Sequence, residues 1–225
     1  MNDTVVRHEV ITARSSRAIR QLRNLCVIML AVFVVLSVAS DSKLHSSGTG
    51  ILSAQTSSGL IVIDAPEQQP WVGSFGSYFL CTTTGHGLTI KKIRYESPVQ
   101  PINVDLWLRR VHTNTSGIIS ARGEPPNFLD PKTGSSLDMG GEFTSFRPGL
   151  RVTRPCSKSG KGSHGFTELI FAGKVGSHGG AIRKAWIDYG IDGSPHRLYS
   201  LQLRWIMVLC GDEVRGIYDK NTCGA

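Results

Sequence analysis

Four cysteines in the C-terminal two thirds of the chain have the most constrained chemistry: Cys81, Cys156, Cys210 and Cys223. None of them stands at the Cys-x-x-Cys spacing that thioredoxin-like redox sites and zinc knuckles use. In an oxidising compartment an even number of cysteines indicates two disulfides, with three pairings open. Cys81 and Cys210 each end an apolar run, whereas the other two lie in loop-like surroundings. We expect Cys156 to pair with Cys210 and Cys81 with Cys223.

Histidine and lysine occur in a near-repeat, Gly162-Ser163-His164-Gly165 and Gly176-Ser177-His178-Gly179, with a lysine just before each copy. Two such loops could share a metal or bind a phosphate. However, the strand predicted between them has roughly seven residues at about 3.3 Å each, which separates the loops by more than about 20 Å. We therefore expect two glycine-rich loops with exposed histidines, and neither a metal site nor a cofactor.

Catalytic carboxylates are represented by one candidate pair, Glu168 and Asp188, which we expect on neighbouring strands. Two carboxylates could support glycosidic chemistry. A single carboxylate on the polar face of a strand is usually only solvated, and neither a nucleophile elbow nor a His-Glu-x-x-His motif occurs in a suitable setting. The prediction is a non-catalytic protein. The alternative is a secreted hydrolase of envelope polymers that uses Glu168, Asp188 or a histidine.

Tryptophan supplies the other candidate contacts, because an indole can stack on a sugar, and the candidates are Trp71, Trp107, Trp186 and Trp205. We expect Trp205 in the core. Trp107 and Trp186 alternate with aliphatic residues, which predicts that they face outward and contribute to a binding surface.

Strands must position these residues. Ser77–Cys81 and Leu88–Tyr95 are expected to form a hairpin, and Val104, Leu106 and Leu108 alternate with polar or aromatic residues as in a half-buried strand. Residues 117–149 are rich in turn residues and predict a long irregular connection, a leading candidate for partner recognition.

The clearest element comes last along the chain. Ile182–Ile191 and Arg197–Cys210 flank Asp192-Gly193-Ser194-Pro195 and predict a long antiparallel hairpin. One face of its second strand is expected to carry Leu201, Leu203, Trp205, Met207 and Leu209. Ile206 and Val208 make the end of that strand apolar on both sides, which is typical of a central strand.

These patterns indicate seven to nine short strands and no helix of note after residue 40. Together with 25 glycines and recurring turn clusters, they predict an all-β fold, an immunoglobulin-like β-sandwich over residues 60–225.

An uncharged, almost wholly apolar segment at residues 25–40 is preceded by five arginines and two acidic residues. This charge distribution predicts a transmembrane helix with residues 1–24 in the cytoplasm and the C-terminal domain outside. The alternative is a signal peptide cleaved after Ala39, which would release the protein. Residues 41–59 are small and polar and predict a flexible linker.

The net charge is +8 for the chain and +5 after residue 40. Without a helix or aromatic platform bearing interleaved Lys and Arg, this excess does not indicate nucleic-acid binding. The expected partners are the membrane, through residues 25–40, and a protein or an envelope polymer.

Several short motifs occur in a recognisable order: Tyr78-Phe79-Leu80-Cys81, Arg154-Pro155-Cys156, Thr167-Glu168-Leu169 and Ile206-Met207-Val208-Leu209-Cys210 followed by Cys223. In this order the chain resembles uncharacterised membrane-anchored extracytoplasmic β-sandwich proteins of high-GC Gram-positive bacteria. The resemblance covers about Ser77 to Cys223. It implies a tethered extracytoplasmic domain and brings no site residues. The sequence thus predicts a membrane-anchored extracytoplasmic binding or interaction module.

Overall fold

A computed structural model of the chain describes residues 50–54, 58–112, 116–156, 165–218 and 222–223. The predicted cytoplasmic segment 1–24 and the apolar segment 25–40 lie outside the described residues. Within the described ranges, no helix has the length and apolarity needed to cross a bilayer.

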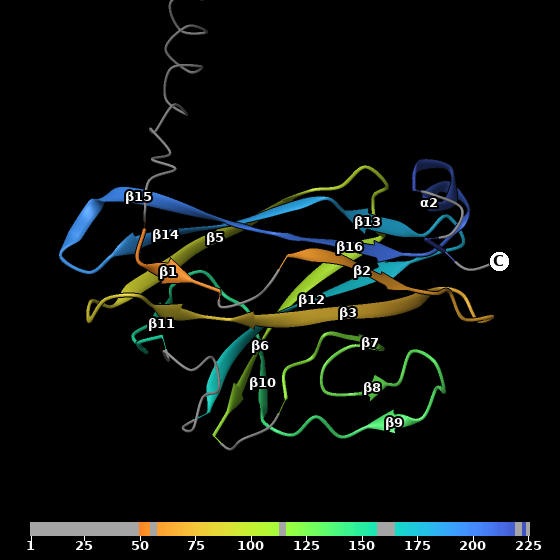
Figure 1. Cartoon of the computed structure of the whole chain (residues 1–225), viewed down its shortest axis with the longest axis horizontal. Helices are drawn as coiled ribbons and strands as arrows, with labels where there is room; N and C mark the ends of the chain where they lie inside the picture. The colour runs from red at the N-terminus through yellow and green to blue at the C-terminus, as the bar shows by residue number, and fades with distance from the viewer. Residues whose placement is uncertain (1–49, 55–57, 113–115, 157–164, 219–221, 224–225) are drawn as a thin grey trace, which may run out of the picture. The chain divides into compact units, whose positions relative to one another are not determined.

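The described residues are predominantly β-structure (Figure 1). The strands are β1 Leu52–Ser53, β2 Gly59–Ile63, β3 Trp71–Phe79, β4 Cys81–Thr82, β5 Leu88–Glu96, β6 Asn103–Val111, β7 Ser120–Arg122, β8 Phe128–Leu129, β9 Ser136–Leu137, β10 Glu142–Ser145, β11 Leu150–Val152, β12 Phe166–Val175, β13 Gly180–Ile182, β14 Lys184–Ile191, β15 Ser194–Leu203 and β16 Trp205–Leu209. A short helix, α2, spans Asp212–Ile217.

β1 and β4 pair with each other as a two-stranded sheet, and the other strands form two packed layers. One layer is a seven-stranded sheet in the order β10-β6-β12-β3-β7-β8-β9. The other combines a four-stranded sheet, β11-β5-β14-β15, with a three-stranded sheet, β13-β16-β2. These two sheets run into each other, because only Arg183 separates β13 from β14 and only Arg204 separates β15 from β16. The fold is therefore an all-β sandwich, as predicted.

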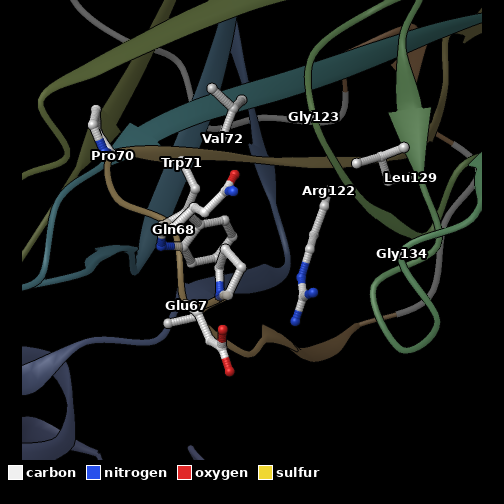
Figure 2. A pocket seen from close by; sticks show the side chains of 11 residues that line it. Glu67, Gln68, Pro70, Trp71, Val72, Arg122, Gly123, Leu129 and Gly134 are labelled. Atoms are coloured by element: carbon white, nitrogen blue, oxygen red, sulfur yellow. The ribbon is translucent and has the colours of Figure 1, made fainter.

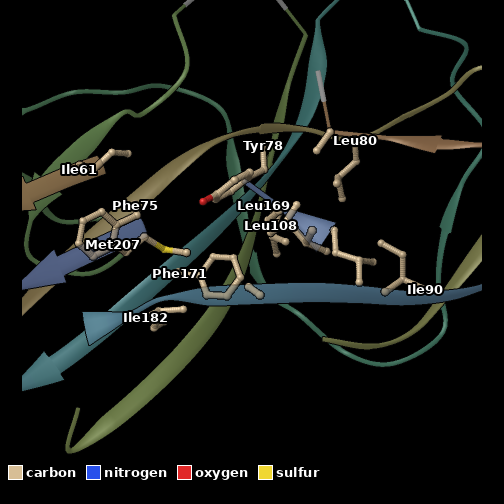
Figure 3. Packing of buried hydrophobic residues seen from close by; sticks show 14 of the residues in the cluster. Ile61, Phe75, Tyr78, Leu80, Ile90, Leu108, Leu169, Phe171, Ile182 and Met207 are labelled. Carbon is tan, nitrogen blue, oxygen red and sulfur yellow. The ribbon is translucent and has the colours of Figure 1, made fainter. Parts of the chain in front are cut away.

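The main hydrophobic core lies between the layers (Figure 3). Phe75, Tyr78 and Phe171 reach it from the seven-stranded sheet, and Ile90 and Met207 reach it from the opposite layer. Each of these side chains is at most 2% exposed. Burying a large apolar side chain contributes about 1.5–3 kcal/mol, so this core is the main source of stability.

Both layers also have a covered outer face. On the seven-stranded sheet, Ile170 packs against Ile118, Ala121 and Phe128 from the segment between β6 and β10. On the three-stranded sheet, Val208 packs with Val214 of α2. The predicted two-sided burial is confirmed for Val208, which is buried, while Ile206 is half-buried against the same cluster, to which α2 contributes Val214.

The predicted C-terminal hairpin is also confirmed. β14 and β15 pair antiparallel, and Gly193 in the turn has φ +83°, a conformation that glycine adopts readily. Leu203, Met207 and Leu209 are buried in the main core, with Leu201 and Trp205 packed against it. The strand is interrupted at Arg204, where the chain passes from the four-stranded to the three-stranded sheet.

Three predictions about elements are wrong. β3 and β5 do not form a hairpin, because they belong to different sheets. Leu52 in the predicted linker 41–59 is 4% exposed and lies in β1, which pairs with β4. The predicted irregular connection 117–149 contains β7 to β10 and has its own apolar cluster.

The predicted disulfide pairing is wrong as well. Cys81 bonds to Cys156, and Cys210 bonds to Cys223. The first bond forms because Thr82 and Pro155 lie side by side in a parallel bridge, which brings the neighbouring cysteines together. The second forms after the chain turns back through α2 over the three-stranded sheet.

Candidate functional site

The two candidate catalytic carboxylates lie in different sheets. Glu168 is on β12 in the seven-stranded sheet, and Asp188 is on β14 in the four-stranded sheet. The predicted strand neighbourhood of these residues is therefore wrong. Each carboxylate instead has an arginine partner of its own.

Glu168 forms a fully buried ion pair with Arg109, with 2.9 Å between Oε2 and Nη1 and both side chains 0% exposed. The other carboxylate oxygen accepts the backbone N–H groups of Ser77, at 2.5 Å, and Ile118, at 2.8 Å. Ser77 can donate because the β3–β12 register shifts there and its φ is +65°. Burial raises the pKa of the Glu168 carboxyl, and these hydrogen bonds act in the opposite direction.

Arg109 connects this carboxylate to the segment that covers the sheet. Its guanidinium donates to the carbonyl oxygens of Ser116 and Gly140, each at 2.9 Å, and to that of Met139. Gly76 permits the close approach, since a Cβ there would lie 2.5 Å from the Ile118 carbonyl oxygen and 2.8 Å from Glu168 Oε1. The buried ion pair therefore holds β6, β12 and the covering segment together. The Glu168 carboxylate has no contact with solvent.

Asp188 lies on the outer face of the four-stranded sheet and is 6% exposed. Arg94 donates to both of its oxygens, at 2.6 and 3.1 Å, and the Ser200 hydroxyl donates at 2.8 Å. The same guanidinium lies over the Trp186 ring, 5.1 Å from its centroid. Trp186 is half-buried, and its predicted availability for stacking is reduced by this arginine.

The histidines do not assemble into a site in the part of the chain that the structure describes. His178 lies in the β12–β13 loop, with Nε2 3.3 Å from the Gln100 carbonyl oxygen. His164, its partner in the near-repeat, lies outside the described residues. Among those described, no group of three or more His, Cys, Asp or Glu side chains is arranged to hold a metal ion.

The tryptophans differ in environment. Trp107 is half-buried and packs on the apolar cluster of Ile118 and Phe128, so the face of β6 that we expected to be solvated is covered. Trp205 packs against the main core, as expected. Trp71 is only 7% exposed, yet it lines a cavity.

That cavity, the Trp71 groove, is the candidate functional site. It has a volume of about 630 Å³, within the range of pockets that bind small molecules. It lies between the segment that leaves β2 and the β7–β9 strands. Its lining residues are Ala65, Pro66, Glu67, Gln68, Pro70, Trp71, Val72, Arg122, Gly123, Leu129 and Gly134.

Strand pairing builds the groove. Arg122 lies opposite Gly73 in the β3–β7 pair, which sets its side chain on the same face of the sheet as Trp71. The two prolines after β2 break the strand and carry Glu67 and Gln68 along the other wall. Figure 2 shows Arg122 on one side of the groove and Trp71, Gln68 and Glu67 on the other.

The groove contains polar groups without partners. Arg122 is half-buried, and its Nη2 donates to the Asp64 carbonyl oxygen at 3.1 Å. Arg122 Nε and Trp71 Nε1 are both covered, and neither has a hydrogen-bond partner among the described residues. Buried donors in native proteins are nearly always paired. Trp107 Nε1, in the lining of a second groove, is also buried without a partner among the described residues, but only the Trp71 groove adds a half-buried arginine without an ion pair among them.

A second groove, of about 680 Å³, lies at the β10 edge of the seven-stranded sheet. It is lined by Trp107, Phe143, Thr144 and Ser145 together with the exposed arginines Arg110 and Arg147. Both of these arginines extend into solvent, where an unpaired charge costs little.

Sequence reasoning named Trp71 as a residue that could stack on a sugar but missed the rest of the groove. Arg122 lies in the segment expected to be irregular, and its position opposite Gly73 depends on pairing between distant strands. The local signal was the pair of prolines, Pro66 and Pro70, directly before Trp71.

Comparison of this chain with protein-family models, curated proteins and solved structures finds no match.

Proposed function

We propose that this chain is a membrane-anchored extracytoplasmic binding module, non-catalytic, that holds its ligand in the Trp71 groove. Residues 25–40 serve as the transmembrane anchor, with the N-terminus inside and the immunoglobulin-like sandwich outside. A cleaved segment would give the same module in secreted form.

The two disulfides support the extracytoplasmic location. Cys81–Cys156 and Cys210–Cys223 use all four cysteines after the apolar segment. Structural disulfides persist in oxidising compartments and are rare in the cytosol. Together with the arginines ahead of residues 25–40, they favour export of the C-terminal domain.

The observation that carries the proposal is the groove itself, a cavity of about 630 Å³ lined by Arg122, which has no ion-pair partner among the described residues, and by Trp71, whose buried Nε1 has no hydrogen-bond partner among them. Arg122 is only half-buried, so an acceptor on a ligand in the groove can bond its guanidinium, and a hydrogen bond to a charged group contributes about 1.5–3 kcal/mol. The groove is therefore suited to binding.

A binding role is favoured over the hydrolase alternative by the state of the two carboxylates. General acid and base catalysis needs carboxylates within reach of one substrate. Glu168 is enclosed by Arg109 and two backbone N–H groups, and Asp188 is held by Arg94 and Ser200 in the other layer.

Calorimetric titration of the purified full chain, in lipid nanodiscs, tests the groove. The probes are a dipeptide, alanyl-leucine, and a sugar, chitotriose. Leu129, which lines the groove and is 40% exposed, is replaced in Leu129→Arg to obstruct it. Ile119→Arg is the matched control, because Ile119 is 61% exposed and does not line the groove.

We expect at least one probe to bind, with affinity at least about tenfold lower in Leu129→Arg and unchanged in Ile119→Arg. Binding that is equal in the two variants, or the absence of binding by both probes, would contradict the proposal.

A further inference from the structure

We propose that the Trp71 groove recognises the free carboxyl terminus of a short peptide, with Arg122 as the partner of the carboxylate and Glu67 as the partner of an ammonium. This inference rests on the proposed function, because it names the ligand class of the same groove.

Arg122 is unusual among the arginines that are at least partly shielded from solvent. Arg109 and Arg94 are paired with Glu168 and Asp188 at 2.9 and 2.6 Å. Even Arg151, which is largely exposed, pairs with Asp192 at 2.7 Å. Arg122 is half-buried, and no described carboxylate lies within ion-pair distance of it.

A carboxylate is the natural partner for this arginine. The planar guanidinium presents its donors in a fork that matches the two oxygens of a carboxylate, and such charge-assisted pairs are the stronger hydrogen bonds in proteins. Arg122 donates a hydrogen bond to the neutral carbonyl oxygen of Asp64, and this contact leaves the charge of the guanidinium uncompensated.

The opposite wall carries negative charge. Glu67 is exposed, lines the groove and forms no ion pair with Arg122 in the described structure. Figure 2 shows the Glu67 and Arg122 side chains extending from opposite sides of the groove. A ligand with a carboxylate at one end and an ammonium at the other satisfies both walls, and a short peptide has both groups.

The remaining lining residues also fit a peptide. Pro66, Pro70, Val72 and Leu129 provide apolar surface for a small aliphatic side chain, and the Gln68 amide can donate to or accept from a peptide bond. A sugar fits less well. It offers no charge to Arg122, and Trp71, at 7% exposed, has almost no free ring face on which a sugar could stack.

Calorimetry with four probes on the unaltered full chain in nanodiscs tests the inference directly. The probes are alanyl-leucine, alanyl-leucine amide, acetyl-alanyl-leucine and chitotriose. We expect alanyl-leucine to bind and amidation of its carboxyl to lower the affinity at least about tenfold, because a charge-assisted bond is lost. Acetylation of its amino group is expected to give a smaller loss, since Glu67 is exposed.

Two variants assign these effects to residues. In Arg122→Gln, alanyl-leucine is expected to bind no more tightly than its amide does. In Glu67→Gln, acetylation is expected to have no further effect. Arg147→Gln, at the second groove, is the matched control and should leave all affinities unchanged. Thermal unfolding of each variant checks that it is folded, and the comparison between probes on the unaltered protein does not depend on any variant.

Equal binding of alanyl-leucine and its amide overturns the inference, and so does unchanged discrimination between them in folded Arg122→Gln. If chitotriose alone binds, and Leu129→Arg abolishes that binding, the peptide inference fails while the proposed function stands. If none of the four probes binds, both fail.

Discussion

The Arg109–Glu168 pair joins β6 and β12 to β3 and to the segment that covers the sheet. Arg109 is on β6, Glu168 is on β12, and the carbonyl and N–H groups that complete the pair come from Ser77 on β3 and from residues 116–118 and 139–140. The sequence identified Glu168 on a strand but predicted a solvated carboxylate. The burial of Glu168 depends on the segment between β6 and β10, which folds over the sheet. Nothing in the local sequence around residue 168 indicates that this segment covers it.

Removing one member of this pair leaves a buried charge without a partner. We expect Arg109→Met to lower the free energy of unfolding by about 3–5 kcal/mol. Adding Glu168→Gln should restore part of the loss, because the amide is neutral and its oxygen can still accept the N–H groups of Ser77 and Ile118. Urea denaturation of the three proteins measures this. If the free energy of unfolding of Arg109→Met lies within about 1 kcal/mol of that of the unaltered protein, the ion pair does not stabilise the fold as we expect.

Tyr78 offers a pH-dependent test of the core. The side chain is fully buried, its hydroxyl has no hydrogen-bond partner among the described residues, and burial raises its pKa well above the ordinary value for tyrosine. Above pH of about 10 the unfolded chain releases the phenol proton and the folded chain retains it. The free energy of unfolding therefore falls as pH rises, by up to about 1.4 kcal/mol per pH unit for this group.

Tyr78→Phe should remove that contribution while leaving stability at neutral pH unchanged or slightly higher, because an unpaired hydroxyl leaves the core. Urea denaturation of both proteins between about pH 8 and about pH 11, a range around the ordinary tyrosine pKa of about 10, gives the change in the free energy of unfolding with pH. Parallel pH profiles for the two proteins would mean that Tyr78 ionises equally well when folded.

At the scale of elements, the sequence predicted individual strands and the hairpin between two adjacent strands. It did not predict which distant strands pair with each other. The β14–β15 hairpin followed from a turn and alternating residues, and the apolar run in β16 correctly indicated burial on both sides. The pairing of β3 with β12 and β7, which brings Arg122 beside Trp71, involves residues about 50 to 100 positions apart. Alternation fixes which face a side chain takes but not which strand lies next to it.

The disulfides illustrate the same limit and give a prediction about elements. Cys81–Cys156 closes a loop of 75 residues and Cys210–Cys223 one of 13. In the loop-entropy account these bonds contribute about 4.5 and about 3 kcal/mol. Cys81→Ser/Cys156→Ser should therefore lose about 1.5 kcal/mol more stability in urea denaturation than Cys210→Ser/Cys223→Ser.

The two double variants should also differ in which segments exchange their amide hydrogens faster. Hydrogen exchange is expected to accelerate in α2 (Asp212–Ile217) only when Cys210–Cys223 is removed, because that bond closes the chain around the helix. Acceleration in α2 for both double variants would show that the helix depends on global stability instead.

At the scale of the whole molecule, composition and turn spacing were sufficient for the all-β class, since many short apolar runs between glycine-rich turns can bury their surface only by stacking sheets. The layered arrangement was not predictable. β2 pairs in parallel with β16, the strand that ends the sandwich, and residues 118–143 form a separate cluster on an outer face. The β2–β16 pair fixes the start of the segment after β2, which forms one wall of the Trp71 groove. The outer cluster supports β7 and β8, which lie at the other wall.

The most direct test of the central claim, a disulfide-stabilised domain outside the membrane, is a map of cysteine state in intact cells that express the full chain. Cells are treated with a membrane-impermeant maleimide, then lysed into a second, isotopically distinct maleimide, and the non-reduced protein is digested for mass spectrometry. The account predicts peptides linked through Cys81–Cys156 and Cys210–Cys223, with neither label on these four residues. Free thiols at these positions that carry only the second label, added after lysis, would place the domain in the cytosol and contradict it.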